Sequence, residues 1–188
     1  MNVTIATIRT LVRYVLNDFS ISMIPGDIFT YVSSSVFTLS ESNEIAVSSV
    51  LVSEVELGSG GYSYDTTTNK VTISSALTVG DTIEIQYTYY PNYSDGEIEG
   101  YIRAAIMHLS VNNYYHFEVE DNTIYPDPNE AEKNLIAIIA GLIAEPNNYS
   151  MTLPDVKINM PKDLPLHDKI SRVIAKAKHN THGVMEIL

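Results

Sequence analysis

The sequence of 188 residues contains no cysteine and no tryptophan. Without cysteine, disulfide scaffolds, cysteine nucleophiles and zinc–thiolate sites are excluded. Charged residues are also scarce, at 18% against about 25% in typical soluble domains. No apolar run reaches the roughly 18–20 residues that a membrane-spanning helix needs, so the sequence predicts no contact with a membrane.

Positive charge is particularly scarce. The chain has 11 lysines and arginines against 23 acids, and the formal net charge of −12 argues against a general nucleic-acid-binding surface. Residues 27–100 contain eleven acids and one lysine, whereas residues 157–188 contain six bases and three acids. We therefore expect an acidic central segment and a basic C-terminal segment. A plain solvated helix face explains the basic residues equally well.

Apolar spacing separates helical from β segments. Residues 4–19 follow the spacing of one helical face, and Pro25-Gly26 predicts the end of this first segment. The next segment, 27–93, is rich in Ser, Thr, Val, Ile and Tyr and alternates apolar with polar residues in several places. This alternation predicts an antiparallel sheet, as a compact sandwich or a meander. The expected strands are 36–39, 45–47, 50–52, 55–57, 62–64, 71–73 and 83–90.

Helix signals return near residue 94. Ser94 begins a capping-box pattern that predicts a helix to about residue 114, and Asp127 with Glu130 predicts a second helix to about residue 144. The second half of the latter helix is apolar nearly all round, which is typical of a helix buried on several sides. Because one small core cannot cover so many apolar residues, we expect some of them to contact a neighbouring subunit or another protein. The candidates are Leu135, Ile136, Ile138, Ile139, Leu142 and Ile143.

The C-terminal part begins with a proline-rich stretch. Residues 145–165 contain four prolines and no clear period, so we expect an extended arm or loop that reaches another protein. Residues 166–180 have one apolar face and predict a last helix. Their opposite face is basic and is expected to meet an acidic partner surface; contact with DNA is the competing hypothesis. The candidate partner-binding bases are Lys157, Lys162, Lys169, Arg172, Lys176 and Lys178.

Together these elements predict an α+β protein. Residues 1–26 and 94–144 are expected to form a helical frame, which with the last helix contains about four helices. Residues 27–93 form an antiparallel β domain inserted into this frame. Residues 145–188 form the C-terminal arm and the basic helix.

No constellation of residues supports catalysis or a cofactor. His179 and His182 have a spacing that can chelate a metal, but solvated histidines at a helix end are the simpler interpretation. Glu118, Glu120 and Asp121 form an acidic cluster without the oxygen spacing of a calcium loop, and a structural role is favoured over acid–base chemistry. We therefore predict no catalytic, cofactor-binding or metal-binding residue, and a protein that is not an enzyme.

Glycine and tyrosine clusters have simple interpretations as well. Gly58-Ser-Gly-Gly61 lacks the Lys-Ser/Thr ending of a phosphate loop and predicts a linker or a hairpin tip. The chain has 13 tyrosines against four phenylalanines. Tyrosines within residues 87–93 offer a carbohydrate-stacking surface, although sheet packing is the commoner use of tyrosines at alternating positions.

The order of these segments resembles the head-to-tail connector, or adaptor, proteins of tailed bacteriophages. The resemblance rests on the first amphipathic helix, the helix opened by residues 93–105 (YSDGEIEGYIRAA), the Asp127-Pro-Asn-Glu130 helix start, and the proline-rich stretch before a basic helix. The β stretch, which includes residues 69–73 (NKVTI) and 79–90 (VGDTIEIQYTYY), is similar to β insertions of phage virion proteins. It is larger than in simpler adaptors, which are mostly helical.

The resemblance implies a structural protein of the virion neck, assembled in the host cytoplasm. Connector proteins form rings, usually of twelve copies, that bind the portal, extend the DNA channel and present a surface to the next neck or tail protein. DNA would be a partner only in transit, and neither catalysis nor a cofactor is implied. The alternative is a phage tail or baseplate β module that binds a receptor carbohydrate through its tyrosine-rich sheet.

Overall fold

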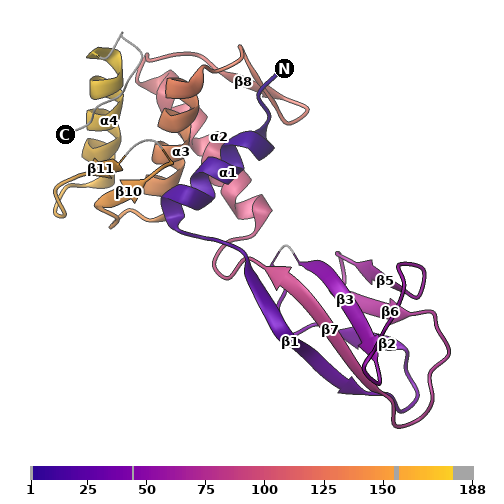
Figure 1. Cartoon of the computed structure of the whole chain (residues 1–188). Coiled ribbons are helices and arrows are strands. Elements are labelled where there is room, and N and C mark those ends of the chain that lie inside the picture. The colour runs from indigo at the N-terminus through magenta and orange to yellow at the C-terminus, as the bar shows by residue number, and fades with distance from the viewer. Residues whose placement is uncertain (1, 44, 155–156, 180–188) are drawn as a thin grey trace. The chain divides into compact units, whose positions relative to one another are not determined.

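The computed structural model describes residues 2–43, 45–154 and 157–179 and has the predicted α+β class. The chain divides into two compact units (Figure 1). The helical unit comprises Met1–Asp18 and Asp95–Leu188, and the β unit comprises Phe19–Ser94. The β unit therefore begins eight residues earlier than the predicted boundary at 27.

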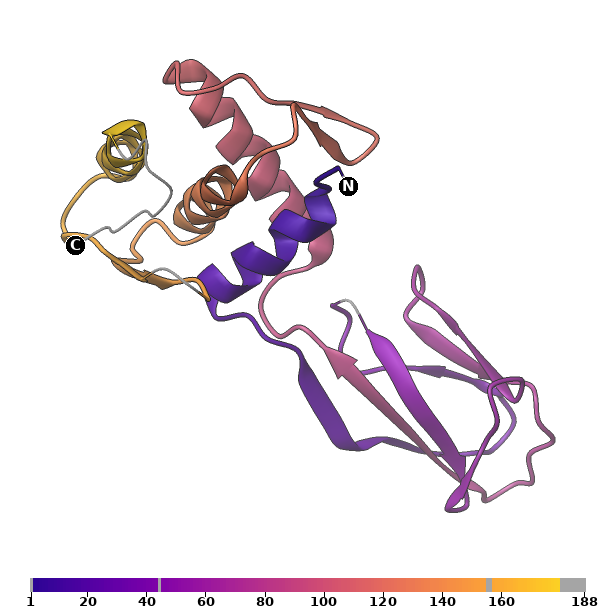
Figure 2. The ribbon, with the colours of Figure 1, turned by 45° about the horizontal axis from the view of Figure 1, so that its top comes forward.

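Helix α3 (Glu130–Ala144) is the centre of the helical unit (Figure 2). Three other helices pack against it: α1 (Ile5–Leu16), α2 (Asp95–Val111) and α4 (Leu166–His179). A helix with neighbours on three sides must be apolar on three sides. This packing explains the apolar character of the second half of α3 without any partner chain.

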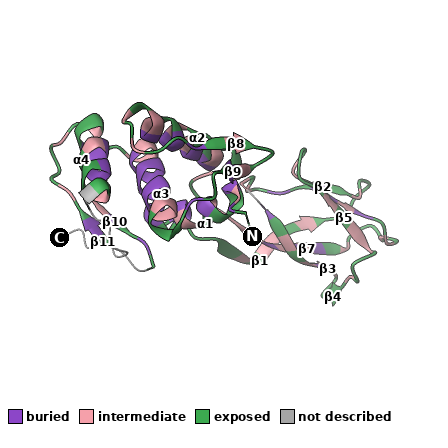
Figure 3. Ribbon diagram, turned by 90° about the horizontal axis from the view of Figure 1, so that it is seen from above, coloured by how far each residue is buried: buried purple, intermediate pink, exposed green. Residues whose placement is uncertain are grey.

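Burial along α3 corrects one prediction. Leu135, Ile139 and Leu142 each have 0% exposure within their own unit, as do Ile136 and Ile138, whereas Ile143 is partly buried. Figure 3 shows much of α3 in the colour of buried residues. They are covered by helices of the same chain, so they are not part of a surface that a neighbouring subunit can contact. The prediction failed because it underestimated how many sides of α3 are covered by the chain's own helices α1, α2 and α4.

The start of α3 also differs from the prediction. Asn129, rather than Asp127, is the N-cap: its side chain accepts a hydrogen bond from the backbone N–H of Glu132, whose carboxylate accepts one from the N–H of Asn129. Asp127 instead accepts a hydrogen bond of 2.6 Å from the backbone N–H of Val3. The capping residues thus lie two positions later than predicted, and Asp127 instead binds the backbone just before α1.

Two short hairpins complete the helical unit: β8 (Glu118–Glu120) with β9 (Thr123–Tyr125), and β10 (Ser150–Thr152) with β11 (Lys157–Asn159). The second hairpin corrects the prediction of an extended arm over 145–165. Met151, Leu153 and Ile158 are buried, and β10 contacts α1. The proline-rich segment folds back onto its own unit because these three apolar side chains have a core to enter.

A cluster of charges joins the first turn of α2 to the end of α1. The guanidinium of Arg13 donates to Asp18 and, at 2.6 Å, to Asp95, and Arg9 lies 2.6 Å from the second oxygen of Asp95. Arg13 and Asp18 are only 6% and 0% exposed. The helix predicted to reach residue 19 ends at Leu16, and Asn17 follows in a left-handed conformation.

The β unit contains two antiparallel sheets around one core. Strands β1 (Ile21–Thr30), β7 (Thr82–Tyr89), β3 (Ala46–Val52) and β4 (Val55–Glu56) form the first sheet in that order. The second contains β2 (Val36–Thr38), β6 (Lys70–Ile73) and β5 (Tyr62–Asp65). Buried residues of both sheets belong to one cluster, which fits the sandwich, the first of the two arrangements that the sequence left open.

Strand β1 was not predicted, because Pro25-Gly26 was interpreted as a break. The strand continues through both residues, and its pairing with β7 shifts register between Met23 and Asp27. A Cβ at Gly26 would lie 1.9 Å from the carbonyl oxygen of Ile85. The glycine is therefore needed for close contact between two strands rather than for a chain reversal.

Candidate interaction surface

Helix α4 has a buried and an exposed side. Ile170, Val173 and Ile174 are buried, as the predicted apolar face requires. Arg172 and Lys176 are exposed and one turn apart on the same side of the helix, and Lys178 is exposed further along it. The amphipathic pattern thus leaves three of the six predicted bases accessible to solvent on α4.

Lys169 is the exception among the six bases. Its side chain is 1% exposed, and its Nζ donates hydrogen bonds to the backbone carbonyls of Pro146 at 2.7 Å and Asn148 at 3.2 Å. These carbonyls belong to the loop after α3, and the ammonium of Lys169 is a donor to both. Lys169 therefore ties α4 to this loop, and its predicted role in binding a partner is corrected.

The other two bases lie in the second hairpin and in the segment that follows it. Lys157 is exposed at the beginning of β11. Lys162 is also exposed, and its Nζ lies 4.3 Å from the ring centroid of Tyr149, a cation–π distance. Tyr149 was not predicted as part of the surface, because nothing in the sequence indicates that the loop after α3 returns to the segment after β11.

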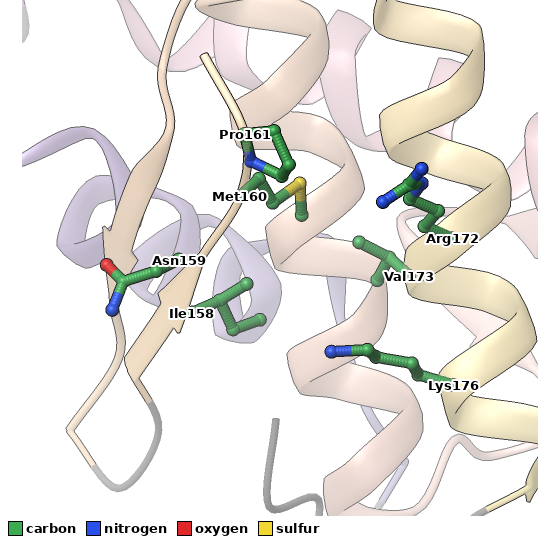
Figure 4. Close-up of a pocket in the computed structure, with 7 residues that line it drawn as sticks. All are labelled: Ile158, Asn159, Met160, Pro161, Arg172, Val173 and Lys176. Atoms are coloured by element: carbon green, nitrogen blue, oxygen red, sulfur yellow. The ribbon is translucent and has the colours of Figure 1, made fainter. Parts of the chain in front are cut away.

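A small cavity separates the hairpin segment from α4 (Figure 4). Its volume is about 70 Å³, and Arg172, Val173 and Lys176 project from α4 toward it. The remaining lining residues come from the hairpin side: Ile158, Asn159, Met160 and Pro161. Cofactor and substrate pockets measure about 300–1,000 Å³. The cavity is therefore suited to the end of one side chain of a partner, with apolar walls and two cations beside it.

Lys178 is linked to another part of the helical unit. Its Nζ donates a hydrogen bond of 3.0 Å to the backbone carbonyl of Asn112, just after α2. We define the α4 surface as Lys157, Lys162, Arg172 and Lys176 together with the cavity. Four of the six predicted bases belong to it, and Lys178, which binds Asn112, does not.

The acidic cluster forms the exposed part of the first hairpin. Glu118 and Glu120 are in β8 and Asp121 is in the turn, and all three are exposed. Glu118 lies 3.4 Å from the exposed Nε2 of His116. Among the described residues, no group of three or more potential ligands could hold a metal ion. The side chain of His179 and all of His182 lie outside the described residues.

The tyrosines of the β unit are used mainly for packing. Tyr87 has 0% exposure, and Tyr62, Tyr64 and Tyr89 pack against the sandwich core. Burial raises the pKa of Tyr87, and the nearby charge of Asp27 adds to this shift. In the described residues of this unit, no tyrosine belongs to the exposed class, so an aromatic platform for sugar stacking receives no support from their burial.

Neither a protein-family model nor a curated protein matches this chain. Across the described ranges, no helix has both the length and the apolar character needed to cross a membrane. The features of the molecule that bear on its function are therefore its two-unit organisation and the charged surfaces of the helical unit.

Proposed function

We propose that this chain is a structural protein of a tailed-bacteriophage virion, a head-to-tail connector whose copies form a ring. The ring, expected to contain twelve copies, would join the capsid portal to the next neck or tail protein and extend the DNA channel. It would be located in the virion neck after assembly in the host cytoplasm.

The observation that carries the proposal is the insertion of a β sandwich between the first two helices of a helical unit. Each unit has its own buried core, so each offers a surface to a different partner. The exposed bases of α4 provide a surface for protein contact, and the cavity beside them is too small for a cofactor. These features favour a mechanical role, and we propose no catalytic activity.

Charge is compatible with DNA in transit. The net charge of −12 means that DNA meets a repulsive surface wherever acids line a channel. A basic lining would instead hold the phosphates through released counterions. DNA is therefore proposed as cargo that passes through the ring, rather than as a bound ligand.

The test is assembly of the full-length chain with the portal protein encoded by the same genome. Mass photometry of the chain alone, of the portal alone and of their mixture should reveal a complex with one connector ring on each portal ring. Nuclease treatment should leave this complex unchanged. A mixture that shows only the two separate species would contradict the proposed function, and selective binding of the chain to a glycan array would favour the carbohydrate-binding alternative.

A further inference from the structure

The helical unit carries opposite charge on two opposite sides. The β8–β9 hairpin contains three exposed acids, Glu118, Glu120 and Asp121, whereas residues 157–179 contain six bases, five of them exposed, and two acids. Figures 1, 2 and 3 place α4 and the β8–β9 hairpin on opposite sides of this unit, with α3 between them. One copy therefore presents an acidic hairpin on one side and the α4 surface on the other.

Charged side chains on both sides are available to a partner, namely Glu120 and Asp121 on one side and Arg172 on the other. Glu120 and Asp121 are exposed, and within the described ranges neither forms an ion pair with a lysine or arginine. Arg172 is exposed on the other side, and no carboxylate of the described residues pairs with it. Both sides also offer apolar contact: Tyr125 beside the acids is 42% exposed, and Met160 and Pro161 line the cavity beside Arg172.

We propose that these two sides bind each other between neighbouring copies of this chain. The β8–β9 hairpin of one copy docks on the α4 surface of the next, with Glu118 and Glu120 opposite Arg172 and Lys176. Because the two sides differ and lie opposite each other, the contact is head-to-tail, and it closes into a ring when the rotation between copies closes. This inference rests on the proposed ring and identifies the contact that builds it.

The charge distribution indicates that the partner bound by the α4 surface is a second copy of this chain. Copies with a net charge of −12 repel each other in most orientations, and the α4 surface is the strongly basic region of the described chain. An acidic hairpin that meets this surface is attracted, while other orientations bring acid against acid. The same pairing therefore promotes association and fixes its orientation.

Engineered cysteines test the contact directly, because the natural chain contains none. Full-length Glu120→Cys and Arg172→Cys chains, mixed and treated with a short bismaleimide, should give a cross-linked dimer. Neither chain alone should give this product to the same extent. Glu54→Cys, at an exposed residue of the β unit, is the matched control and should not cross-link to Arg172→Cys above the background of random collision.

Charge reversal supplies the second readout. Arg172→Glu with Lys176→Glu should weaken self-association by about tenfold or more, as should Glu118→Lys with Glu120→Lys. All four changes in one chain restore opposite charges across the contact and should recover most of the association. Lys70→Glu, at an exposed residue of β6, is the control for a change in net charge, and circular dichroism checks that each variant is folded.

The outcomes separate this inference from the proposed function. A chain that binds the portal but neither cross-links through positions 120 and 172 nor responds to charge reversal overturns the inference alone. Cross-linking and charge-swap rescue without portal binding overturn the proposed function alone. If the reversal at Arg172 and Lys176 removes only DNA binding and leaves self-association unchanged, the α4 surface contacts nucleic acid and the inference is wrong.

Discussion

At the residue scale, the pair of Arg13 and Asp18 is nearly inaccessible to water, and Asp95 shares the same guanidinium. Asp18→Ala leaves Arg13 buried with one carboxylate fewer, and removing one partner of a buried pair costs about 3–5 kcal/mol. We expect the free energy of unfolding to fall by about 3 kcal/mol, the lower end of this range, because Asp95 still pairs with Arg13. Urea unfolding of the wild type and the variant, monitored by far-UV circular dichroism, measures this difference in stability.

The matched control for this prediction is Glu99→Ala. Glu99 pairs with Arg103 at 2.6 Å, but both side chains are partly solvated. An exposed pair of this kind contributes about 0–1 kcal/mol. Equal losses for the two variants would mean that burial of Arg13 and Asp18 does not set the strength of their interaction.

Single residues also mark the limit of sequence-based prediction. Six bases were expected on one accessible surface, yet Lys169 is buried and satisfied by the carbonyls of Pro146 and Asn148. In a helical pattern, Lys169 and Lys176 are equivalent cations. Only the path of a loop more than twenty residues earlier in the chain distinguishes them, and local spacing carries no information about that path.

At the scale of elements, the contact between α1 and α3 depends on Gly141. A Cβ at this position would lie 2.3 Å from Cγ1 of Val15, a separation that real side chains do not adopt. Gly141→Ala should therefore destabilise the helical unit by about 1–3 kcal/mol through overpacking, despite the better helix propensity of alanine. Thermal unfolding measures the change.

A second helical glycine provides the control. A Cβ at Gly100, in α2, has no heavy atom within 4 Å, so Gly100→Ala should raise stability by about 0.5–1 kcal/mol through propensity alone. Val15→Ala combined with Gly141→Ala should cost less than the sum of the two single changes, because the smaller side chain vacates the space. Stabilisation by both glycine substitutions would contradict the close contact.

The elements that were predicted share a clear period, and those that were missed do not. Helix α4 was located nearly to the residue because its apolar spacing spans the whole element. Strand β1 was missed because Pro25 and Gly26 obscure its alternation, and its pairing with β7 depends on contacts distant in sequence. The β10–β11 hairpin was missed because each strand has three residues, too few to establish a period.

At the scale of the whole molecule, the chain is built from two units with separate cores. The buried residues of the β cluster lie between Phe37 and Tyr87, Met23 and Phe29 of the same unit pack against them, and α3 is covered by helices of the helical unit. A sandwich with its own core can be inserted between two helices without altering the core around α3. This independence is what the proposed ring requires if its two units contact different neighbours.

The same independence predicts the result of deleting the β unit. Replacing residues 19–94 with a short Gly/Ser linker should leave a protein with helical circular dichroism and a cooperative thermal transition. The physical reason is that Asp18 and Asp95, the two residues at the new junction, are both held by Arg13, so a short linker has little distance to close.

The matched control is the same deletion with Asp18→Ala, which removes part of that attachment. This variant should remain helical but melt at a lower temperature, because the junction is then held through Asp95 alone. The isolated segment 19–94 should give a β-type spectrum, since its core is complete. If the deletion instead abolished helicity while the full chain stayed folded under the same conditions, the helical unit would depend on the sandwich, and a connector built from two independent units would lose its physical basis.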